Sequence, residues 1–596
     1  MFQEFDATGN PAAHPPRLAA LRDVMVQDGL DGFLIPRADA HQGEYVAEAD
    51  ARLRWLTGFS GSAGIAIVTA DQAAVLVDGR YKVQARAELD LDHFAPVDFP
   101  ATRPAEWLRK ALPDGGRVAF DPWLHTHREI QDLREKLEAD NIGLIPVANL
   151  VDRIWTDRPD PPKGKARLHD DAYAGASAAD KRARIAQDLR QSGQQAAVIT
   201  LADSLAWLLN IRGRDIPRNP VVLGFAVIDA SGAVQLFADP EKFDSDVRQK
   251  LGNEVSIIHP EGFVAALANL SGPVRVDPAS APEAVFQILH ENDITVIKAD
   301  DPVVMPKAQK NDAEIAGMRD AHLTDAAVMA RFLAWLEATA PGGLTEIDVV
   351  RKLEEMRRQA GILDISFDTI SGVGPHAALP HYRVSDASNL PLADGQVILV
   401  DSGGQYQNGT TDITRTMAVG TMDDEVREVF TRVLQGMIAV SRLRFPKGLA
   451  GRDIDAVARA PLWSVGLDYD HGTGHGVGAA LCVHEGPARI SRVSEVPLAE
   501  GMILSNEPGY YREGDFGIRI ENLLVVQPAE SPDGRDMLAF ETLTFVPIDR
   551  RMIVTGMLSP AERDWLDAYH AEVLEKLGPL VDAETLGWLE QATAPI

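Results

Sequence analysis

The sequence HGTGHGVG at residues 471–478 lies between two segments that each carry a pair of candidate metal-binding acids. The upstream segment is ILVDSGGQYQNGTTDITRTMAV (398–419), and the downstream segment is GMILSNEPGYYREGDFGIRIENLLVV (501–526). Together they offer four carboxylates and one imidazole: Asp401, Asp412, His475, Glu507 and Glu521. Hard oxygen ligands with a single nitrogen favour a pair of divalent cations such as Mn²⁺ over a thiolate zinc site. Two such ions would balance four negative charges that could not be buried unpaired.

The upstream segment has the pattern of a strand, a turn and a second strand, with one acid on each arm. Either a two-residue turn at Asn408-Gly409 or a longer loop centred between Tyr406 and Gln407 connects the strands. Both alternatives place Asp401 and Asp412 on one face of the sheet, because side chains along a strand alternate with a period of two.

The downstream segment repeats this pattern. Glu507 and Glu521 lie equally far along the chain from Gly514, a natural turn residue, so they can face each other. Arg519 shares the face of Glu521 and could orient ligand carboxylates; the plainer alternative is a structural Arg–Glu pair. Two similar hairpins predict a duplicated, pseudo-symmetric domain that holds a metal pair between its halves.

The glycine-rich segment carries two candidate histidines. Its alternating glycines exclude a stable helix and let backbone pass close to a metal or substrate while His471 and His475 project. A phosphate cradle is an alternative, but no lysine follows as a P-loop requires. His381 in PHYR and His484 in CVHEGP could transfer protons or hold substrate, although either alone is more often structural. Trp463, on a helix just before the glycines, is a core residue or a subunit contact, and its spacing favours the core.

Length and composition describe a globular protein of several domains. The 596 residues suggest three or four domains, and 45% hydrophobic and 24% charged residues leave ample material for large cores. A net charge of −30 disfavours nucleic acid and anionic membranes as partners. Cys482 is the single cysteine, so no internal disulfide is possible. Without a signal-peptide core or an apolar run long enough for a membrane span, the chain is expected to be cytoplasmic.

Helical and strand patterns alternate through the first half of the chain. An amphipathic helix over 17–30 precedes a buried strand, and the proline-rich residues 154–170 form the best linker. Residues 203–243 mirror 52–85, since each has Leu-x-Trp-Leu, a glycine-containing loop, two apolar strands and a helix start. We interpret them as two related α/β domains, although any α/β domain could give so loose a similarity.

From about residue 306 the pattern changes to longer helices. Residues 425–445 and 453–467 are amphipathic. Three further helices begin with capping boxes, the last of them in a stretch that looks like an appendage: Asn311–Glu314, Thr345–Asp348 and Ser559–Glu562.

At the acid hairpins the order D…TTDITRT…HGTGHGVG…NEPG…GIRIEN resembles the pita-bread metallopeptidases, which include methionine aminopeptidase, prolidase and aminopeptidase P. Over residues 20–596 the chain resembles the three-domain cytosolic Xaa-Pro aminopeptidases (aminopeptidase P), with further blocks such as DGRYKVQA, NIRGRDIPRNPV and FDTISGVGPHAALPHYR. The resemblance implies an α/β and α+β fold with a homodimeric assembly. Two creatinase-like N-terminal α/β domains, 1–155 and 156–305, would precede a pita-bread catalytic domain with pseudo-symmetric halves and a C-terminal extension, 306–596.

The same resemblance implies the metal ligands. Asp401 matches the bidentate ligand of one metal, and His475 matches the single imidazole ligand of the other. Asp412 and Glu521 match bridging carboxylates. Glu507 matches a ligand that also takes a proton from a bridging water. In the family the two ions are usually Mn²⁺, sometimes Co²⁺ or Zn²⁺.

It implies the substrate contacts and the reaction as well. His381, His471 and His484 match catalytic histidines that hold the substrate and stabilise developing charge, and Arg80 in DGRY matches a substrate-binding arginine. The implied reaction is release of an N-terminal residue that precedes proline, by attack of a hydroxide shared by two metal ions. Alternatives on the same fold are a prolidase that takes only dipeptides, a metal-free creatinase, and a non-catalytic peptide-binding module. The ligand set is complete here, whereas the last two lack it.

Overall fold

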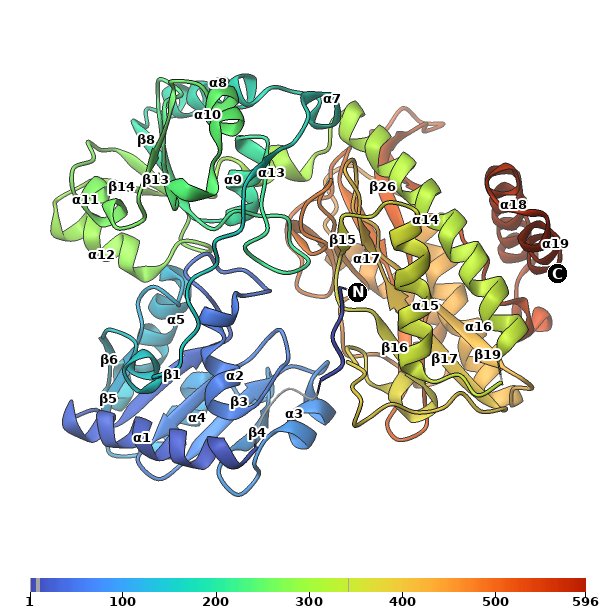
Figure 1. Ribbon diagram of the computed structural model, residues 1–596, viewed down its shortest axis with the longest axis horizontal. Coiled ribbons are helices and arrows are strands. Elements are labelled where there is room, and N and C mark those ends of the chain that lie inside the picture. Colours follow the sequence, from blue (N-terminus) through green and yellow to red (C-terminus); the bar gives the residue numbers. More distant parts are fainter. Residues whose placement is uncertain (1, 7–10, 341) are drawn as a thin grey trace. The chain divides into compact units, whose positions relative to one another are not determined.

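The structure is a computed structural model that describes residues 2–6, 11–340 and 342–596. It divides into two compact units: one contains residues 11–304, and the other contains residues 2–6, 305–340 and 342–596 (Figure 1). Within the described ranges, no helix has both the length and the apolar character that crossing a membrane would require.

The unit of residues 11–304 contains two six-stranded sheets with the same strand order. The first sheet, in spatial order, consists of β4 (Ala95–Asp98), β3 (Ala73–Val77), β2 (Ile65–Thr69), β1 (Gly32–Pro36), β5 (Gly116–Phe120) and β6 (Ile142–Pro146). The second consists of β12 (Val255–Ile258), β11 (Val234–Phe237), β10 (Phe225–Asp229), β8 (Ala196–Ile199), β13 (Val274–Val276) and β14 (Val296–Lys298). In the first sheet β1, β2 and β3 pair antiparallel, whereas β4, β5 and β6 each pair in parallel with their neighbour. In the second sheet β8, β10 and β11 pair antiparallel, whereas β12, β13 and β14 each pair in parallel with their neighbour. The shared order and directions confirm the prediction of two related α/β domains.

Helices accompany each of these sheets. Around the first lie α1 (His14–Gln27), α2 (Arg52–Thr57), α3 (Lys82–Glu88), α4 (Pro104–Ala111), α5 (His127–Leu137) and α6 (Leu150–Ile154). Around the second lie α8 (Ala178–Gln191), α9 (Ala202–Leu208), α10 (Ser245–Leu251), α11 (Gly262–Ala268) and α12 (Glu283–Glu291). The short elements β7 (Arg167–Leu168) and α7 (Asp171–Ala174) lie between the two domains in the sequence, and β7 pairs antiparallel with β9 (Ile211–Arg212), which follows α9. Helix α1 forms because Leu18, Leu21 and Met25, at helical spacing, are all buried.

The two α/β domains pack through a local pseudo-twofold axis at the starts of α5 and α12. The amide of His127 donates to the carbonyl of Ala281 at 3.1 Å, and the amide of Glu283 donates to the carbonyl of His125 at 2.9 Å. The two hydrogen bonds are equivalent, because His127 and His125 in the first domain correspond to Glu283 and Ala281 in the second. At the same place His127 Nδ1 lies 2.6 Å from Glu283 Oε2.

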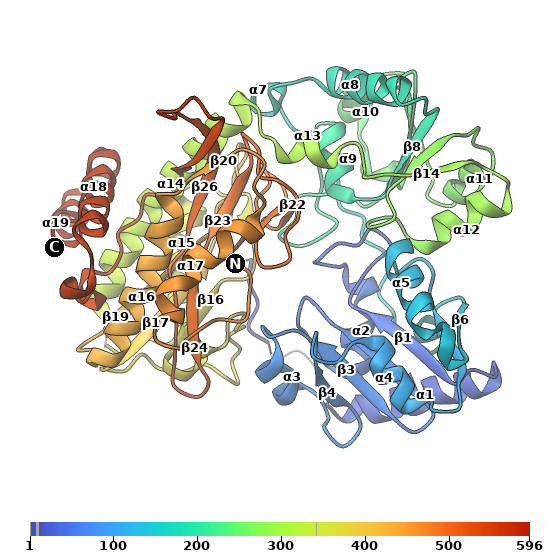
Figure 2. The ribbon, with the colours of Figure 1, turned by 180° about the vertical axis from the view of Figure 1, so that it is seen from behind.

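The second unit is built from two similar halves, each a pair of packed helices followed by an antiparallel sheet. After the short α13 (Val304–Ala308), the first half contains α14 (Asp312–Thr339), α15 (Glu346–Gln359) and the sheet β16-β17-β19 (Ile370–Val373, Gln396–Ser402, Ile413–Val419). A minor pair, β15 (Asp364–Ile365) and β18 (Gly404–Gln405), lies beside it. The second half contains α16 (Asp424–Ser441), α17 (Gly451–Trp463) and a six-stranded sheet. Helices α14 and α15 face the viewer in Figure 1, whereas α16 and α17 do so from behind in Figure 2.

The six-stranded sheet has the spatial order β20 (Arg444–Pro446), β27 (Met537–Thr542), β26 (Asn522–Ala529), β23 (Ile503–Asn506), β21 (Gly474–Gly476) and β22 (Glu485–Ile490). The pair β24 (Gly509–Arg512) and β25 (Phe516–Arg519) forms the tip of its central hairpin. Both acid hairpins therefore occupy corresponding places in the two halves, as the sequence predicts.

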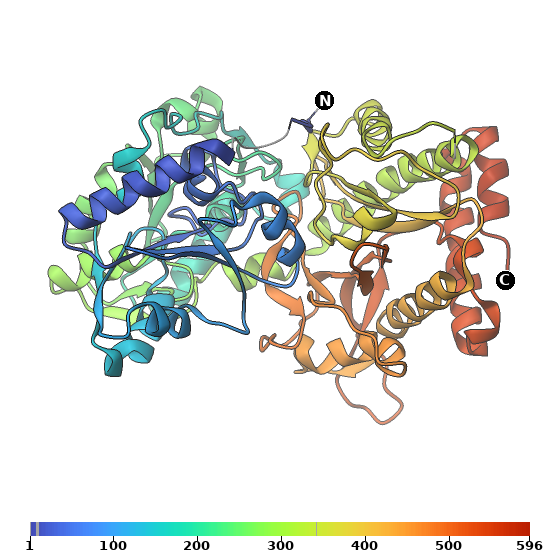
Figure 3. The ribbon, with the colours of Figure 1, turned by 90° about the horizontal axis from the view of Figure 1, so that it is seen from below.

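Each of the three predicted capping boxes opens a helix. Asn311, Thr345 and Ser559 accept hydrogen bonds from the third residue of α14, α15 and α18 (Pro560–Leu577). The predicted appendage, α18 with α19 (Ala583–Ala592), packs against α14 (Figure 3).

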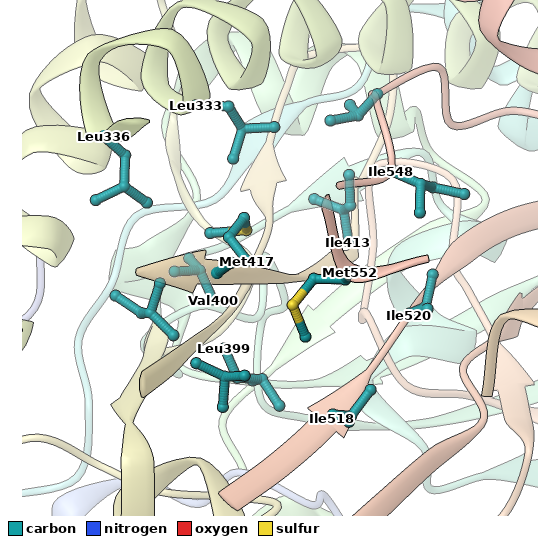
Figure 4. Packing of buried hydrophobic residues seen from close by; sticks show 14 of the residues in the cluster. Leu333, Leu336, Leu399, Val400, Ile413, Met417, Ile518, Ile520, Ile548 and Met552 are labelled. Carbon is teal, nitrogen blue, oxygen red and sulfur yellow. The ribbon is translucent and has the colours of Figure 1, made fainter. Parts of the chain in front are cut away.

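A large apolar core lies between the sheets and these helices. Leu333 and Leu336 of α14 point toward Met417 of β19, and Ile548 and Met552 close the cluster from the chain that follows β27 (Figure 4). This packing fixes β17 and β19, the strands of the upstream acid hairpin.

Trp463 is a correction to the sequence prediction. Its spacing favours the core, but the structure leaves its side chain 43% exposed at the last position of α17. The buried stripe of α17 runs through Ile454, Ala458 and Leu462 at intervals of four residues. Asp455 and Arg459 lie in the same row of α17 as Trp463 and are buried, so Trp463 is exposed by its place at the C-terminal end of the helix and not by its helical phase.

Candidate metal centre

The upstream hairpin brings Asp401 and Asp412 to one face, as predicted, but with neither predicted turn. Asp401 pairs with Thr414, so Asp412, two residues before Thr414, shares its face. The tip is centred between Gln407 and Asn408, between the two alternatives we considered.

Gly409 explains this difference. It is not a turn glycine: a Cβ there would lie 2.7 Å from the Cβ of Ala321 in α14. The residue is needed for the close approach of the hairpin to the helix, and the turn moves one position toward the N-terminus.

The downstream hairpin has the predicted register. Asn506 pairs with Asn522 and Gly509 with Arg519, which sets Glu507 opposite Glu521. Gly514, with φ of +77°, occupies the turn as expected.

The glycine-rich segment contributes β21, whose glycines serve strand packing. A Cβ on Gly474 would lie 1.9 Å from the carbonyl oxygen of Ser505 in the neighbouring strand β23. Ser505 Oγ accepts the amide of His475 at 2.9 Å and donates to Glu507 Oε1 at 3.0 Å. The close contact thus sets His475 beside the downstream hairpin.

The five predicted ligands converge on one place. Three overlapping groups have ligand atoms within 4.8 Å of one another: Asp401 with Asp412 and Glu521; His475 with Glu507 and Glu521; and Asp412 with His475 and His484. His475 Nε2 lies 3.5 Å from both Asp412 Oδ2 and Glu507 Oε1. His475 Nδ1 lies 2.9 Å from the carbonyl of Gly476, so Nδ1 carries the proton and Nε2 faces the carboxylates.

The cluster has the electrostatics of a cation site. Burial, together with Asp412 and Glu507, raises the pKa of Asp401 to about 7. Burial and the other carboxylates also raise the pKa of Glu521 well above its ordinary value. Burial lowers the pKa of His475, but the carboxylates of Asp412 and Glu507 outweigh it, and the pKa rises to about 9. The cluster therefore needs positive charge, from protons or from cations.

Orphaned oxygens support cations as its occupants. Oδ1 of Asp401 and Oε1 of Glu521 are buried and accept no hydrogen bond from the described residues. The second oxygen of Glu521 accepts from Thr414 Oγ1 at 2.8 Å. Carboxylates held in this way by one oxygen present the other to a metal, so the residues fit a pair of divalent ions.

Arg519 connects the centre to two of the predicted histidines. Its Nη2 donates to Asp401 Oδ2 at 2.5 Å and to the carbonyl of Pro380, next to His381, at 3.1 Å. Its Nη1 donates to the hydroxyl of Tyr511 at 2.6 Å, and that oxygen lies 2.8 Å from His471 Nε2. The Arg–Glu pair considered from the sequence is thus replaced by a pair with Asp401.

The other predicted residues are placed as follows. The ring of His484 lies edge-on to that of His475, with centroids 4.2 Å apart. Arg80, in the other unit, is held by Asp78 through Nε at 3.0 Å and Nη2 at 2.7 Å. Its contact with substrate stays a prediction.

Sequence reasoning missed Tyr511, although a signal was present. With the turn at Gly514, Tyr511 and Arg519 fall on the same face of the hairpin by strand parity.

Sequence reasoning also missed two buried clusters of ion pairs that contact residues adjacent to Asp412 and His484. Arg357 and Asp325 pair at 2.8 Å, and Asp325 also accepts a hydrogen bond from Thr411, next to the predicted ligand Asp412. Glu485, next to His484, is bound by both Lys307 and Lys310 in the protein interior. These partners lie far apart in the sequence, so no local pattern could reveal them.

Four protein-family models together match most of the chain from residue 17 to residue 596. Residues 17–154 and 157–314 each match a family described as Creatinase/Prolidase N-terminal domain. Residues 316–528 match Metallopeptidase family M24, and residues 536–596 match the C-terminal region of peptidase M24.

Relatives extend over nearly the whole length. "Aminopeptidase P2" of Arabidopsis thaliana is 41% identical, with 97% of this chain and 88% of the relative covered. A "Probable Xaa-Pro aminopeptidase P" of Talaromyces stipitatus is 39% identical, with 97% and 92% covered. A crystal structure of X-prolyl aminopeptidase from Caenorhabditis elegans, described as a cytosolic enzyme with a di-nuclear active site, superposes with a TM-score of 0.93 at 35% identity and covers 98% of this chain and 100% of that one.

Proposed function

Because the chain belongs to the aminopeptidase P family of M24 metallopeptidases, we propose that it removes the N-terminal residue from peptides whose second residue is proline. The observation that carries the proposal is the convergence of four carboxylates and His475 from both halves of the second unit. An Xaa-Pro bond has a tertiary amide without an N–H, so peptidases that depend on that donor fail on it. Cleavage of an Xaa-Pro bond therefore requires a site that does not depend on this donor.

We propose two divalent ions in this centre, with Mn²⁺ as the native metal and Co²⁺ or Zn²⁺ as substitutes. Asp401, Asp412, His475, Glu507 and Glu521 would hold them, and a set of oxygens with one imidazole suits Mn²⁺. When bound, the ions would polarise the scissile carbonyl and activate a shared water as the nucleophile.

The protein's own groups supply the remaining chemistry. Glu507 takes a proton from the attacking water, and its raised pKa, caused first by burial, suits it to do so. His484 donates a hydrogen bond to the substrate carbonyl oxygen as charge develops there. His381 holds the substrate near the centre. His471, whose two ring nitrogens lie within hydrogen-bond distance of Gly472 and Tyr511, steadies Arg519 and meets the substrate with its ring.

We further propose a homodimer that acts in the cytoplasm on free peptides, with no nucleic acid or membrane partner. Trp463, Val465 and Val493 expose 43%, 46% and 81% of their surfaces, and Arg492 lies 5.7 Å from the Trp463 ring. An exposed tryptophan among exposed valines is typical of a subunit contact.

One assay separates the proposal from its alternatives. Purified protein is stripped of metal with a chelator, reloaded with Mn²⁺, and offered an Xaa-Pro dipeptide, an Xaa-Pro-Xaa tripeptide, the matched Xaa-Ala-Xaa tripeptide and an N-acetylated form. We expect metal-dependent cleavage of Xaa-Pro-Xaa with little cleavage of the last two. Hydrolysis of the dipeptide alone would indicate a prolidase, and binding without hydrolysis would indicate a non-catalytic module.

A further inference from the structure

The first residues of the chain are built into the second unit. In the segment 2–6, Gln3 and Phe5 are buried, with 2% and 7% exposed, whereas Glu4 and Asp6 are exposed. This alternation is that of an extended strand with one face against the protein. Phe5 belongs to the same apolar cluster as α14, β17 and β19.

One side of this segment rests on α15. Glu354 of α15 accepts the amide of Phe2 at 2.5 Å and the amide of Gln3 at 3.1 Å. One turn to either side of Glu354, Arg351 lies over the ring of Phe5 and Arg358 over the ring of Phe2, at 5.4 and 5.9 Å. The three α15 side chains share a helix face, so that face is shaped for two aromatic residues three positions apart.

The other side of the segment binds both ends of the stretch that carries His381. The side-chain amide of Gln3 accepts from the amide of Thr369 at 2.8 Å and donates to its carbonyl at 3.3 Å. The carbonyl of Phe5 accepts from the amide of Asp386 at 2.9 Å. We refer to residues 369–386 as the His381 segment.

The His381 segment starts and ends at these two contacts. Ile370, next to Thr369, pairs with the ligand Asp401 in the neighbouring strand. The chain then leaves the sheet, passes through the short helix at 374–378 and His381, and returns to Asp386. Residues 2–6 therefore join the two ends of a loop that carries His381, the proposed substrate contact.

We propose that residues 2–6 act as a strap that positions the His381 segment, with Gln3 and Phe5 as positioning residues. This inference rests on the proposed function, because it assumes that His381 meets the substrate. Without the strap, the two ends of the segment would lose their shared support. Arg519 would still hold the carbonyl of Pro380, so His381 would stay near the centre but would be less precisely placed before the substrate binds. The contacts of Phe2, Gln3 and Phe5 predict that this place binds a peptide of the pattern aromatic-glutamine-x-aromatic.

A truncated enzyme with the strap supplied in trans tests this directly. A variant of the chain from which only residues 2–6 are deleted is loaded with Mn²⁺ and assayed on an Xaa-Pro-Xaa peptide. We expect two metals per subunit and a KM raised roughly tenfold, the order that losing one net hydrogen bond gives. The pentapeptide Phe-Gln-Glu-Phe-Asp, added in trans, should restore the KM, whereas a scrambled peptide should not.

Hydrogen exchange provides a readout independent of activity. The amides of Thr369 and Asp386 donate to the strap, so they should lose protection in the truncated protein while amides of β17 keep theirs. Gln3→Ala should reproduce the effects in milder form, and the matched control Glu4→Ala, on the exposed face, should not. If the truncated protein does not fold, the two point variants carry the same test.

The outcomes separate the strap from the proposed function. Lost protection with unchanged KM and kcat would overturn the positioning role, and retained protection would overturn the strap itself. If the wild-type protein does not cleave Xaa-Pro peptides, the proposed function fails, and the exchange measurement alone still decides whether residues 2–6 hold the His381 segment.

Discussion

Asp301→Asn is expected to stabilise the domain that contains it, by an amount that depends on pH. Asp301 precedes α13, is 3% exposed, and accepts the amide of Val303 at 2.8 Å. Asn149 occupies the corresponding place in the first domain, where it accepts the amide of Val151 and donates to Asp121 at 3.0 Å. An asparagine at 301 can make the first bond and offer the second to a neighbouring acid.

The magnitude follows from the pKa of Asp301. Burial, with Asp203 and Asp277 nearby, raises this pKa from 3.8 to about 6. At 1.36 kcal/mol per pKa unit, the ionised carboxylate costs the folded state about 3 kcal/mol at pH 8. Because the folded pKa is the higher one, the wild-type domain loses stability as pH rises from about 4 to about 6. The advantage of asparagine should grow from about 1.5 kcal/mol at pH 5 to about 3 kcal/mol at pH 8.

Native-state hydrogen exchange in increasing urea measures this difference in the full chain, at β13 and β14. A domain-specific readout is needed because a chain of several domains need not unfold in one step. Asp300→Asn, at the exposed neighbouring position, is the matched control and should leave the opening free energy within about 0.5 kcal/mol of the wild-type value. An equal advantage at pH 5 and pH 8, or none at pH 8, would refute the reasoning.

Four further outcomes are expected. Glu521→Gln should lose bound metal and activity together, measured by metal analysis after dialysis; near-normal activity in a metal-stripped protein would contradict a dinuclear site. His484→Ala should keep two metals and bind substrate nearly normally but lose about 10²–10³ in turnover, and loss of a metal would instead make it a ligand. Lys310→Met should lower turnover, because it removes one of the two lysines that neutralise Glu485 next to His484. If Glu485 acts through His484, the same substitution should cause no further loss of turnover in a His484→Ala variant. Trp463→Glu should convert a dimer to a monomer in light scattering, whereas a wild-type mass near 65 kDa would exclude the dimer.

The elements whose signals are local could be predicted from the sequence. The capping boxes of α14, α15 and α18 begin helices where expected, because a side chain and an amide three residues apart decide the start. The register of the downstream hairpin also followed from one glycine, since the strands leave Gly514 symmetrically.

Tertiary contacts decided the rest. The upstream turn moved by one position because Gly409 is required against α14, a contact that no local pattern shows. Trp463 was misplaced because helical spacing predicts which face is buried but not how far along the helix the burial extends. The clusters of Glu485 with Lys307 and of Asp325 with Arg357 join distant parts of the chain and have no signature in the sequence.

The pseudo-twofold contact between the first two domains bears on self-association. A surface that pairs with its own copy is self-complementary, so either domain alone could in principle meet a second molecule of itself there. In such a homotypic pair His127 would face His127, or Glu283 would face Glu283, and a buried pair of like carboxylates is unfavourable. Only the mixed pair gives the bond of His127 with Glu283, to which Arg134 adds a second at 2.8 Å. One histidine and one glutamate at equivalent positions thus favour intramolecular pairing over oligomerisation of either domain.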